Sequence, residues 1–233
     1  MAIVVESTGS ASGVTASLDI TNFTVGSQTG KILLVCVSYV DGSRPNTVTW
    51  DSAGVNQALT NLKRQRESVS SGRAVDIWYL LNPTAATAKT ITIANTGSTD
   101  TIGGAIFLSG CANASAAAAF RDTTLTGDTA DSESGASHPA TVTLTSAVGE
   151  LVAAVAVSGT ALTSHTMDTE HWNATTGTIG VGGTKAGAAS VTTSWDTAGA
   201  NTQWAIAAVS VIPSGAGGGG MVMLRRRQLL GVG

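Results

Sequence analysis

The side chains with the most chemical potential are concentrated in one stretch, SHTMDTEHW. His165, Asp168, Glu170 and His171 lie there within seven residues, and histidine and carboxylate groups are both common zinc ligands. Their spacing does not match the H-E-x-x-H motif, which places two histidines on one helix face. No further His or Cys lies close by in the sequence. We therefore favour a solvated loop over a metal site, and expect neither a metal nor a cofactor.

A second acidic stretch contains Asp128, Asp131 and Glu133. Carboxylates of this kind can bind calcium, but the order D-x-[DN]-x-[DN]-G of a calcium loop is missing. We favour a mobile acidic loop.

Nucleophilic catalysis requires a nucleophile, a base and an orienting group. The three histidines, His138, His165 and His171, all fall in loop-like sequence, and no G-x-S-x-G elbow is present. The glycine-rich run contains Gly180, Gly182 and Gly183. It lies in a β context with no following helix, unlike a phosphate-binding loop. The sequence predicts that the chain is not an enzyme.

Composition excludes two further classes. The 233 residues are 42% hydrophobic with a net charge of only -3, whereas disordered chains combine low hydrophobicity with high net charge. The 12 basic residues are scattered apart from one short run, so the clustered charge that replaces phosphate counterions is missing. We expect a folded protein that does not bind nucleic acid.

The N-terminal sequence MAIVVESTGSASG has no basic n-region, and no apolar run reaches the length of about 18 residues that a membrane helix needs. We expect a soluble, not conventionally exported protein that does not contact membranes. The sequons at Asn22, Asn113 and Asn173 are then accidents of composition. Cys36 and Cys111 lie in apolar, strand-like sequence, and we expect free buried thiols, with a disulfide left open if their strands are neighbours.

Short alternating runs of Thr, Val, Ile and Ser between Gly, Asn and Asp predict β-strands joined by tight turns. Eleven such strands favour an all-β fold, an antiparallel β-sandwich of jelly-roll or immunoglobulin-like type. The expected strands are 14–20, 31–39, 47–50, 73–81, 89–94, 102–108, 140–145, 150–157, 178–181, 188–195 and 203–212. Within 73–81, alternation predicts that Val75, Ile77 and Tyr79 face the core.

Helical signal is weak. Segment 52–66 has Val55, Leu59 and Leu62 at helix-like spacing, and segment 112–120 is rich in alanine. A short helix is the less favoured interpretation of each segment.

The two halves of the chain have similar sequence layouts. KILLVCVSYVDG matches GELVAAVAVSGT, and KTITIANTGSTDTIGGAIFLSG matches ASVTTSWDTAGANTQWAIAAVSVIP. We expect an internal pseudo-repeat with halves 1–122 and 139–213 inside one domain, 1–213. The segment 123–138 is either a linker or a long crossover.

After Pro213 the composition changes to SGAGGGG followed by MVMLRRRQLLGVG, so residues 214–233 read as a flexible hinge and a basic, apolar arm. A positive arm on a negative body predicts contact with an acidic neighbouring surface, and a disordered terminus is the equal alternative. The expected partner-binding residues are Met221, Val222, Met223, Leu224, Arg225, Arg226, Arg227, Leu229 and Leu230.

Carbohydrate-binding modules stack exposed aromatic rings on sugars. Trp50 and Trp195 occur in the similar contexts VTWDSAG and TSWDTAG, which makes them the candidate sugar-stacking residues. The alternative is that both pack inside the sheets.

The succession KILLVCVSYVDG, TVTWDSAG, VDIWYLLNPTAATAKTITI and IFLSGC resembles a β-sandwich domain recurrent among bacteriophage virion proteins. Tyr79, Leu80, Asn82, Pro83, Thr90 and Thr92 fit that pattern. Ala86 stands where glycine is usual, and the likeness covers most of residues 30–213.

The resemblance implies a structural protein located in the virion, a capsid decoration (cement) protein or a head or tail appendage. Its partners would be the major capsid protein or other virion subunits, and a homo-oligomer, with a trimer favoured, is expected. The residues 2–5 and 221–230 would serve as arms that add to a neighbour's sheet edge. Glycan binding in host adhesion is the alternative function.

Overall fold

The computed structural model describes residues 1–40, 44–66, 72–132, 139–198 and 203–215. The described chain is built almost entirely of antiparallel β-strands, with one four-residue helix, α1 (Ala116–Ala119). The expectation of an all-β fold is therefore confirmed.

The first seven strands form one sheet. Its strand order is β4-β3-β7-β2-β6-β5, with β1 paired to β7. The strands are β1 (Val4–Val25), β2 (Ile32–Val40), β3 (Pro45–Trp50), β4 (Gln57–Ala58), β5 (Thr60–Arg66), β6 (Arg73–Leu81) and β7 (Ala86–Ser109).

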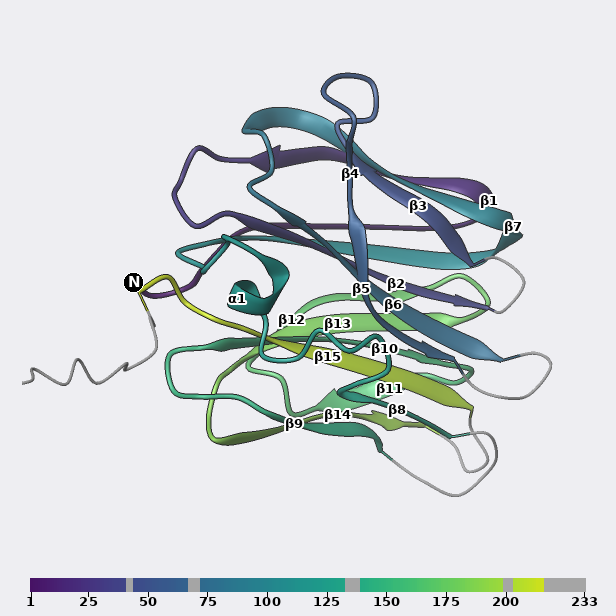
Figure 1. Cartoon of the computed structure of the whole chain (residues 1–233). Coiled ribbons are helices and arrows are strands. Elements are labelled where there is room, and N and C mark those ends of the chain that lie inside the picture. Colours follow the sequence, from purple (N-terminus) through teal and green to yellow (C-terminus); the bar gives the residue numbers. More distant parts are fainter. Residues whose placement is uncertain (41–43, 67–71, 133–138, 199–202, 216–233) are drawn as a thin grey trace, which may run out of the picture.

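Strands β1 and β7 are long enough to take part in two layers. The first half of β7 pairs with β3, and its second half, from Thr101 to Leu108, pairs with β2. Strand β1 follows β7 along both halves in antiparallel register, from Val4 opposite Ser109 to Val25 opposite Ala86. The sheet consequently folds over on itself and is nearly barrel-like (Figure 1).

The rest of the chain forms two smaller sheets that continue the stack below β2 and β6 in Figure 1. One has the order β12-β13-β10-β15-β8 and the other β11-β14-β9. The strands are β8 (Thr129–Ser132), β9 (Ala140–Thr145), β10 (Leu151–Ser158), β11 (Leu162–His165), β12 (Thr169–Thr175), β13 (Ile179–Ala186), β14 (Ser190–Thr197) and β15 (Trp204–Val211).

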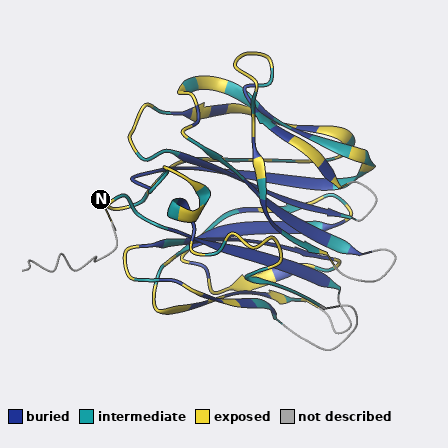
Figure 2. Cartoon of the chain, in the orientation of Figure 1, coloured by how far each residue is buried: buried dark blue, intermediate teal, exposed yellow. Residues whose placement is uncertain are grey.

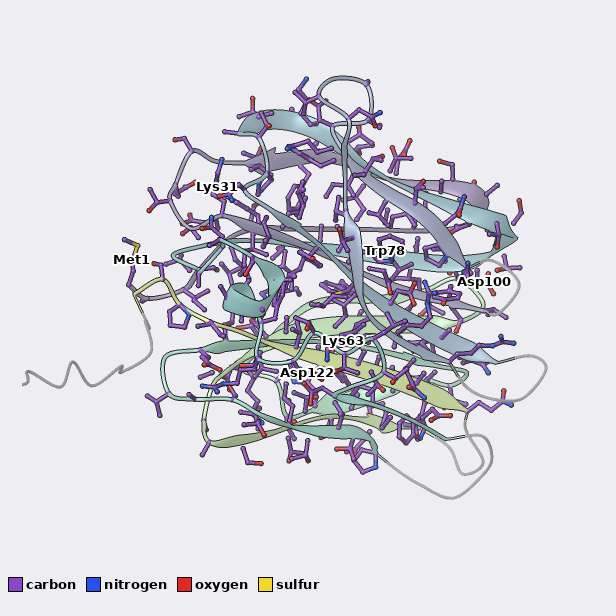
Figure 3. All side chains as sticks on the ribbon, in the orientation of Figure 1. Met1, Lys31, Lys63, Trp78, Asp100 and Asp122 are labelled. Atoms are coloured by element: carbon purple, nitrogen blue, oxygen red, sulfur yellow. The ribbon has the colours of Figure 1, made fainter. Side chains whose placement is uncertain are left out.

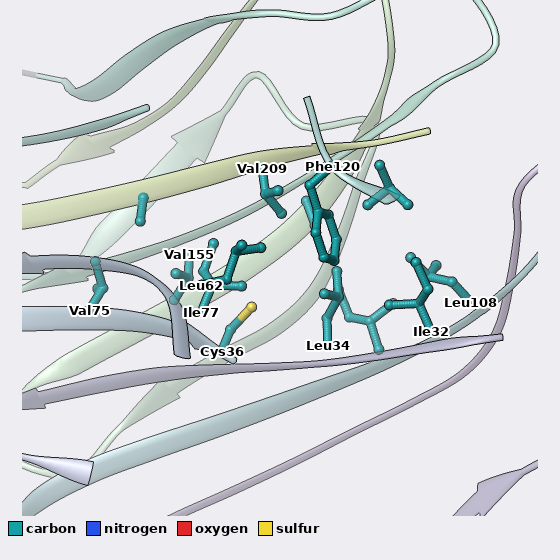
Figure 4. Packing of buried hydrophobic residues seen from close by; sticks show 14 of the residues in the cluster. Ile32, Leu34, Cys36, Leu62, Val75, Ile77, Leu108, Phe120, Val155 and Val209 are labelled. Atoms are coloured by element: carbon teal, nitrogen blue, oxygen red, sulfur yellow. The ribbon is translucent and has the colours of Figure 1, made fainter. Parts of the chain in front are cut away.

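Buried apolar side chains form three clusters in this stack, and Figure 2 shows that the strands in its middle are mostly buried. The first cluster fills the folded-over sheet and the third lies between the two smaller sheets. The second, drawn in Figure 4, joins the two parts of the chain: Leu34 and Ile77 meet Val155 and Val209 there. We call it the central interlayer.

Central strands are buried on both faces. In β2, Leu34 and Cys36 lie in the central interlayer, whereas Leu33 and Val35 lie in the cluster above it. A strand with two buried faces needs a continuous apolar run rather than alternation, which explains the sequence ILLVCVSYV.

The prediction that Val75, Ile77 and Tyr79 face the core is confirmed, and the opposite face of their strand, β6, is buried as well. Val75 and Ile77 face one core, and Ala74 and Trp78 on the opposite face are buried in the other cluster. Asp76 is also fully buried. Its carboxylate is compensated there because Arg64 donates two hydrogen bonds to it, at 2.9 and 2.7 Å.

Segment 52–66 contains no helix. A turn after Asp51 leads into β4 and β5, and Asp51, at φ 49°, accepts a backbone hydrogen bond from Gly54. In segment 112–120 the helix does form, as α1, where the Ser115 side chain accepts a hydrogen bond from the Ala118 amide. Ser115 is a favourable N-cap residue.

Candidate functional site

The segment SHTMDTEHW is mostly strand, so the expectation of a solvated loop is wrong for three of its four chemical residues. His165 ends β11, whereas Glu170 and His171 lie in β12. Each carboxylate accepts a structural hydrogen bond: Asp168 from the Ala186 amide at 2.7 Å, and Glu170 from Trp195 Nε1 at 3.0 Å.

The two histidines are also held by neighbours. His171 Nε2 lies 2.9 Å from Thr184 Oγ1, and partial burial lowers the pKa of its imidazole. The His165 ring packs beside the Trp195 ring, with centroids 6.5 Å apart. Within the described ranges, no group of three His, Cys, Asp or Glu residues is placed to hold a metal ion.

Two acidic residues after position 121 lie beside the buried ammonium group of Lys63. Lys63 has no exposed side-chain surface, and its Nζ lies 2.7 Å from Asp122 and 3.7 Å from Asp128 (Figure 3). Asp131 accepts a hydrogen bond from Gln65 at 2.7 Å. The expectation of a mobile acidic loop is therefore wrong for Asp131, which lies in β8, and Asp128 lies beside the Lys63 ammonium group. Glu133 lies outside the described residues.

The glycines of β13 allow a close approach of layers. A Cβ on Gly182 would lie 1.9 Å from the Trp172 ring, and a Cβ on Gly104 of β7 would lie 2.3 Å from it. A Cβ on Gly180 would lie 2.8 Å from Ser38, whose hydroxyl donates to the Ala156 carbonyl at 3.1 Å. These glycines allow the two parts of the chain to pack closely. Nothing in the glycine-rich sequence indicated that Trp172 and Ser38 would pack against it.

Both candidate sugar-stacking residues are in the interior. The side chains of Trp50 and Trp195 have 0% exposure, and the Nε1 atom of Trp50 donates to the Thr84 carbonyl at 3.0 Å. Their rings present no face to a ligand, so the prediction that they stack on sugars is corrected. The other three tryptophans, Trp78, Trp172 and Trp204, are buried as well.

Cys36 and Cys111 are free and buried, as expected. Burial raises the pKa of each thiol to about 12. Thiolate is the reactive form of cysteine, so neither residue is a candidate nucleophile.

A groove of about 370 Å³ opens where the central interlayer reaches the surface. Its lining comes from the start of β1, the start of β10, the start of β12 and the end of β13. We call it the terminal groove; it is lined by Ala2, Ile3, Val5, Gly149, Glu150, Leu151, Asp168, Thr169, Thr184, Lys185 and Ala186.

The charged groups at the terminal groove are engaged in bonds. Glu150 forms a two-pronged pair with Arg121, at 2.6 Å for each prong, and accepts a hydrogen bond from Ser210 at 2.7 Å. Lys185 donates to the Thr192 carbonyl at 3.0 Å. This arrangement fixes the groove's shape rather than preparing an acid or a base.

Both ends of the described chain meet beside the terminal groove. The Met1 amino group donates to the Ser214 carbonyl at 2.8 Å, and Figure 1 shows the last described residues, coloured yellow, next to the N-terminus. The residues expected to bind partners, 221–230, lie outside the described residues.

The other expected arm, residues 2–5, belongs to the body. Val4 and Val5 pair with Ser109 and Leu108 as the start of β1, so they are not free to add to a neighbour. The sequence VVESTGSASG lacks a strong apolar alternation, which concealed its role as a long strand.

Sequence reasoning missed the terminal groove, because its lining residues are small or polar and come from four separate segments. The one available signal was the composition change after Pro213, which marks where the chain leaves the body.

Comparison with known proteins found no matching family model, no matching curated protein and no matching solved structure. In the part of the chain that the structure describes, no helix is long and apolar enough to cross a membrane.

Proposed function

We propose that this chain is a non-enzymatic structural protein of a bacteriophage virion, a capsid decoration protein or a head or tail appendage that attaches to neighbouring subunits through its C-terminal arm. The observation that carries the proposal is that both ends of the described part of the chain meet at one pole, where Met1 donates a hydrogen bond to Ser214. An arm that leaves a rigid body at a single point is suited to tethering that body to a surface.

We also propose that the body consists of two copies of one β-sandwich unit. The order of the paired strands supports this internal repeat. In the first part of the chain the lower layer has the order β5-β6-β2-β7-β1, and the five-stranded sheet has the order β12-β13-β10-β15-β8. The outer layers also correspond, with β3-β7-β1 matching β11-β14-β9. Each pair of equivalent strands occurs in the same order along the chain.

The interior supports a role that demands rigidity. Asp76 accepts hydrogen bonds from Arg64 and from the Tyr39 hydroxyl, and Lys63 is tied to Asp122. Removing one partner of such a buried pair strongly destabilises the fold, because the other charge stays buried without compensation. A fold with several of them has few alternative packings.

Charge supports the arm as the contact element. Without the three arginines of the arm, nine basic residues remain against 15 acidic ones, a net charge of -6. Opposite charge on arm and body favours contact between the arm of one subunit and an acidic surface such as that of another. The major capsid protein, other virion subunits and copies of this chain, with a trimer favoured, are the proposed partners.

Deletion of residues 216–233 tests this proposal. The truncated protein is expected to lose co-sedimentation with phage particles while keeping the far-ultraviolet circular dichroism of a β-rich protein. The matched control replaces Arg225, Arg226 and Arg227 with glutamine, which keeps the length and the apolar residues of the arm. Undiminished binding of the truncated protein would overturn the role of the arm.

No observation favours glycan binding. That alternative depended on Trp50 and Trp195, and both rings are buried.

A further inference from the structure

We propose that the terminal groove is the docking site for the apolar segment Met221–Leu224 of the same chain. This inference rests on the proposed function, because both treat the C-terminal arm as a binding segment. It adds that the arm binds its own body when no particle is present.

The last described residues, which directly precede the arm, lie beside this groove. Ser214 is bonded to Met1 at 2.8 Å, and the next residue, Ala2, lines the groove. Six residue steps separate Gly215 from Met221. A fully extended chain covers about 20 Å in six steps, and a glycine-rich chain of this length has a root-mean-square span of about 13 Å. Met221 therefore reaches the groove without stretching the hinge.

The lining of the groove suits an apolar segment that is followed by positive charge. Ile3, Val5 and Leu151 are only partly buried and offer apolar surface. Asp168 is exposed at the same groove. With Met221–Leu224 seated on the apolar surface, the arginines that follow Leu224 lie within reach of this carboxylate.

The edges beside the groove indicate how the segment is held. Among the described strands, β1 pairs with β7 alone and β12 pairs with β13 alone. Both edges have irregular register close to the groove, between Val5 and Ser7 and between Glu170 and Trp172. Bulges of this kind discourage the addition of a further strand. The groove thus takes up side chains, and the segment does not extend either sheet.

The short hinge favours the chain's own segment over that of a second copy. A flexible linker of a few residues gives a tethered ligand an effective concentration in the millimolar range. A second copy at micromolar concentration competes poorly with it.

Disulfide trapping in the full-length protein tests this inference. One variant combines Met223→Cys with Thr169→Cys, an exposed position that lines the groove. The native thiols do not interfere, because Cys36 and Cys111 are buried. Under mild oxidation we expect an intramolecular disulfide, read by mass spectrometry of the non-reduced digest, to form at least about tenfold faster than in the control, in line with millimolar effective concentration.

The control combines Met223→Cys with Thr29→Cys. Thr29 is exposed and does not line the groove. It lies close to the last described residues, because Gly110 donates a hydrogen bond to the Thr29 carbonyl at 3.0 Å and accepts one from the Ser214 amide at 2.7 Å. Eight residue steps from Gly215 to position 223 span up to about 29 Å. An arm without a seat therefore reaches Thr29→Cys as well, whereas a seated arm favours Thr169→Cys.

Two outcomes would overturn the inference. Equal trapping in both variants means that the arm has no seat, and trapping only between two molecules means that the groove belongs to a second copy. Both outcomes are read on isolated protein. Particle binding is measured separately with the truncated chain, so failure of this inference is distinguishable from failure of the proposed function.

Discussion

The central interlayer is closed at one place and open at another. Around Trp172 it is closed, because Gly104 and Gly182 leave no Cβ in the way of the indole ring. It opens into the terminal groove at the partly buried residues Ile3 and Leu151, which pack against the interlayer and line the groove. A large ring between glycines holds two layers together, whereas small and partly exposed residues at the edge leave space that an additional segment can fill.

The strongest way to break the closed region is Trp172→Ala. Removal of a buried tryptophan costs about 3–5 kcal/mol through lost apolar burial and the cavity left behind. The free energy of unfolding, measured by denaturant titration, should fall by this amount. Gly104→Ala alone should also destabilise, because its Cβ would lie 2.3 Å from the ring.

The double variant sharpens this comparison. With the Trp172 ring absent, the methyl group of Gly104→Ala meets no indole. The double variant should therefore lose clearly less unfolding free energy than the sum of the losses in the two single variants. Additive effects would show that the ring and the glycine do not pack against each other across the interlayer.

Ser38→Ala removes a hydrogen bond that joins the same two layers. Its hydroxyl is fully buried and donates to the Ala156 carbonyl at 3.1 Å. A loss of about 1 kcal/mol in unfolding free energy is expected, the usual contribution of one hydrogen bond. An unchanged denaturation midpoint would mean that this bond does not hold the layers together.

His171 lies between the closed and the open regions and makes stability depend on pH. Burial lowers its pKa in the folded state, so the unfolded chain takes up a proton first as pH falls below the ordinary value of about 6.5. Its contribution is complete above that pH and is lost as pH falls through the folded-state pKa. His171→Gln should flatten the thermal stability profile between about pH 7 and 5; an unaltered profile would assign the dependence to other groups.

Ala2→Arg should affect the open region alone. Ala2 is exposed and lines the groove, so stability should stay within about 0.5 kcal/mol of the parent protein. The added side chain occupies the groove and repels the arginines of the arm. Trapping between Met223→Cys and Thr169→Cys should then fall to the level of the Thr29→Cys control.

Local pattern predicted most strands but not the burial of polar ones. Ala140–Thr145 was predicted with its observed bounds, because its alternation matches a strand with one buried face. Strand β5, with sequence TNLKRQR, was missed because Lys63 is accommodated in the interior by distant partners such as Asp122, 59 residues away. No local pattern contains that information.

Long-range pairing explains two other differences. The segments 89–94 and 102–108 were expected as separate strands, yet β7 continues through Thr99, which pairs with Thr15 of β1. In β12, the polar neighbours of Trp172 concealed a strand whose one large side chain fills the interlayer. The candidate arm was evident from composition, whereas its proposed seat depends on four segments that only the fold brings together.

The most direct test of the proposed function is the copy number of this chain, relative to the major shell protein, in virus particles purified from its source. Quantitative mass spectrometry should find it in many copies per particle, hundreds for a decoration protein and a few to a few tens for an appendage. Its absence from washed particles would contradict the proposal that the chain is a structural component of the virion.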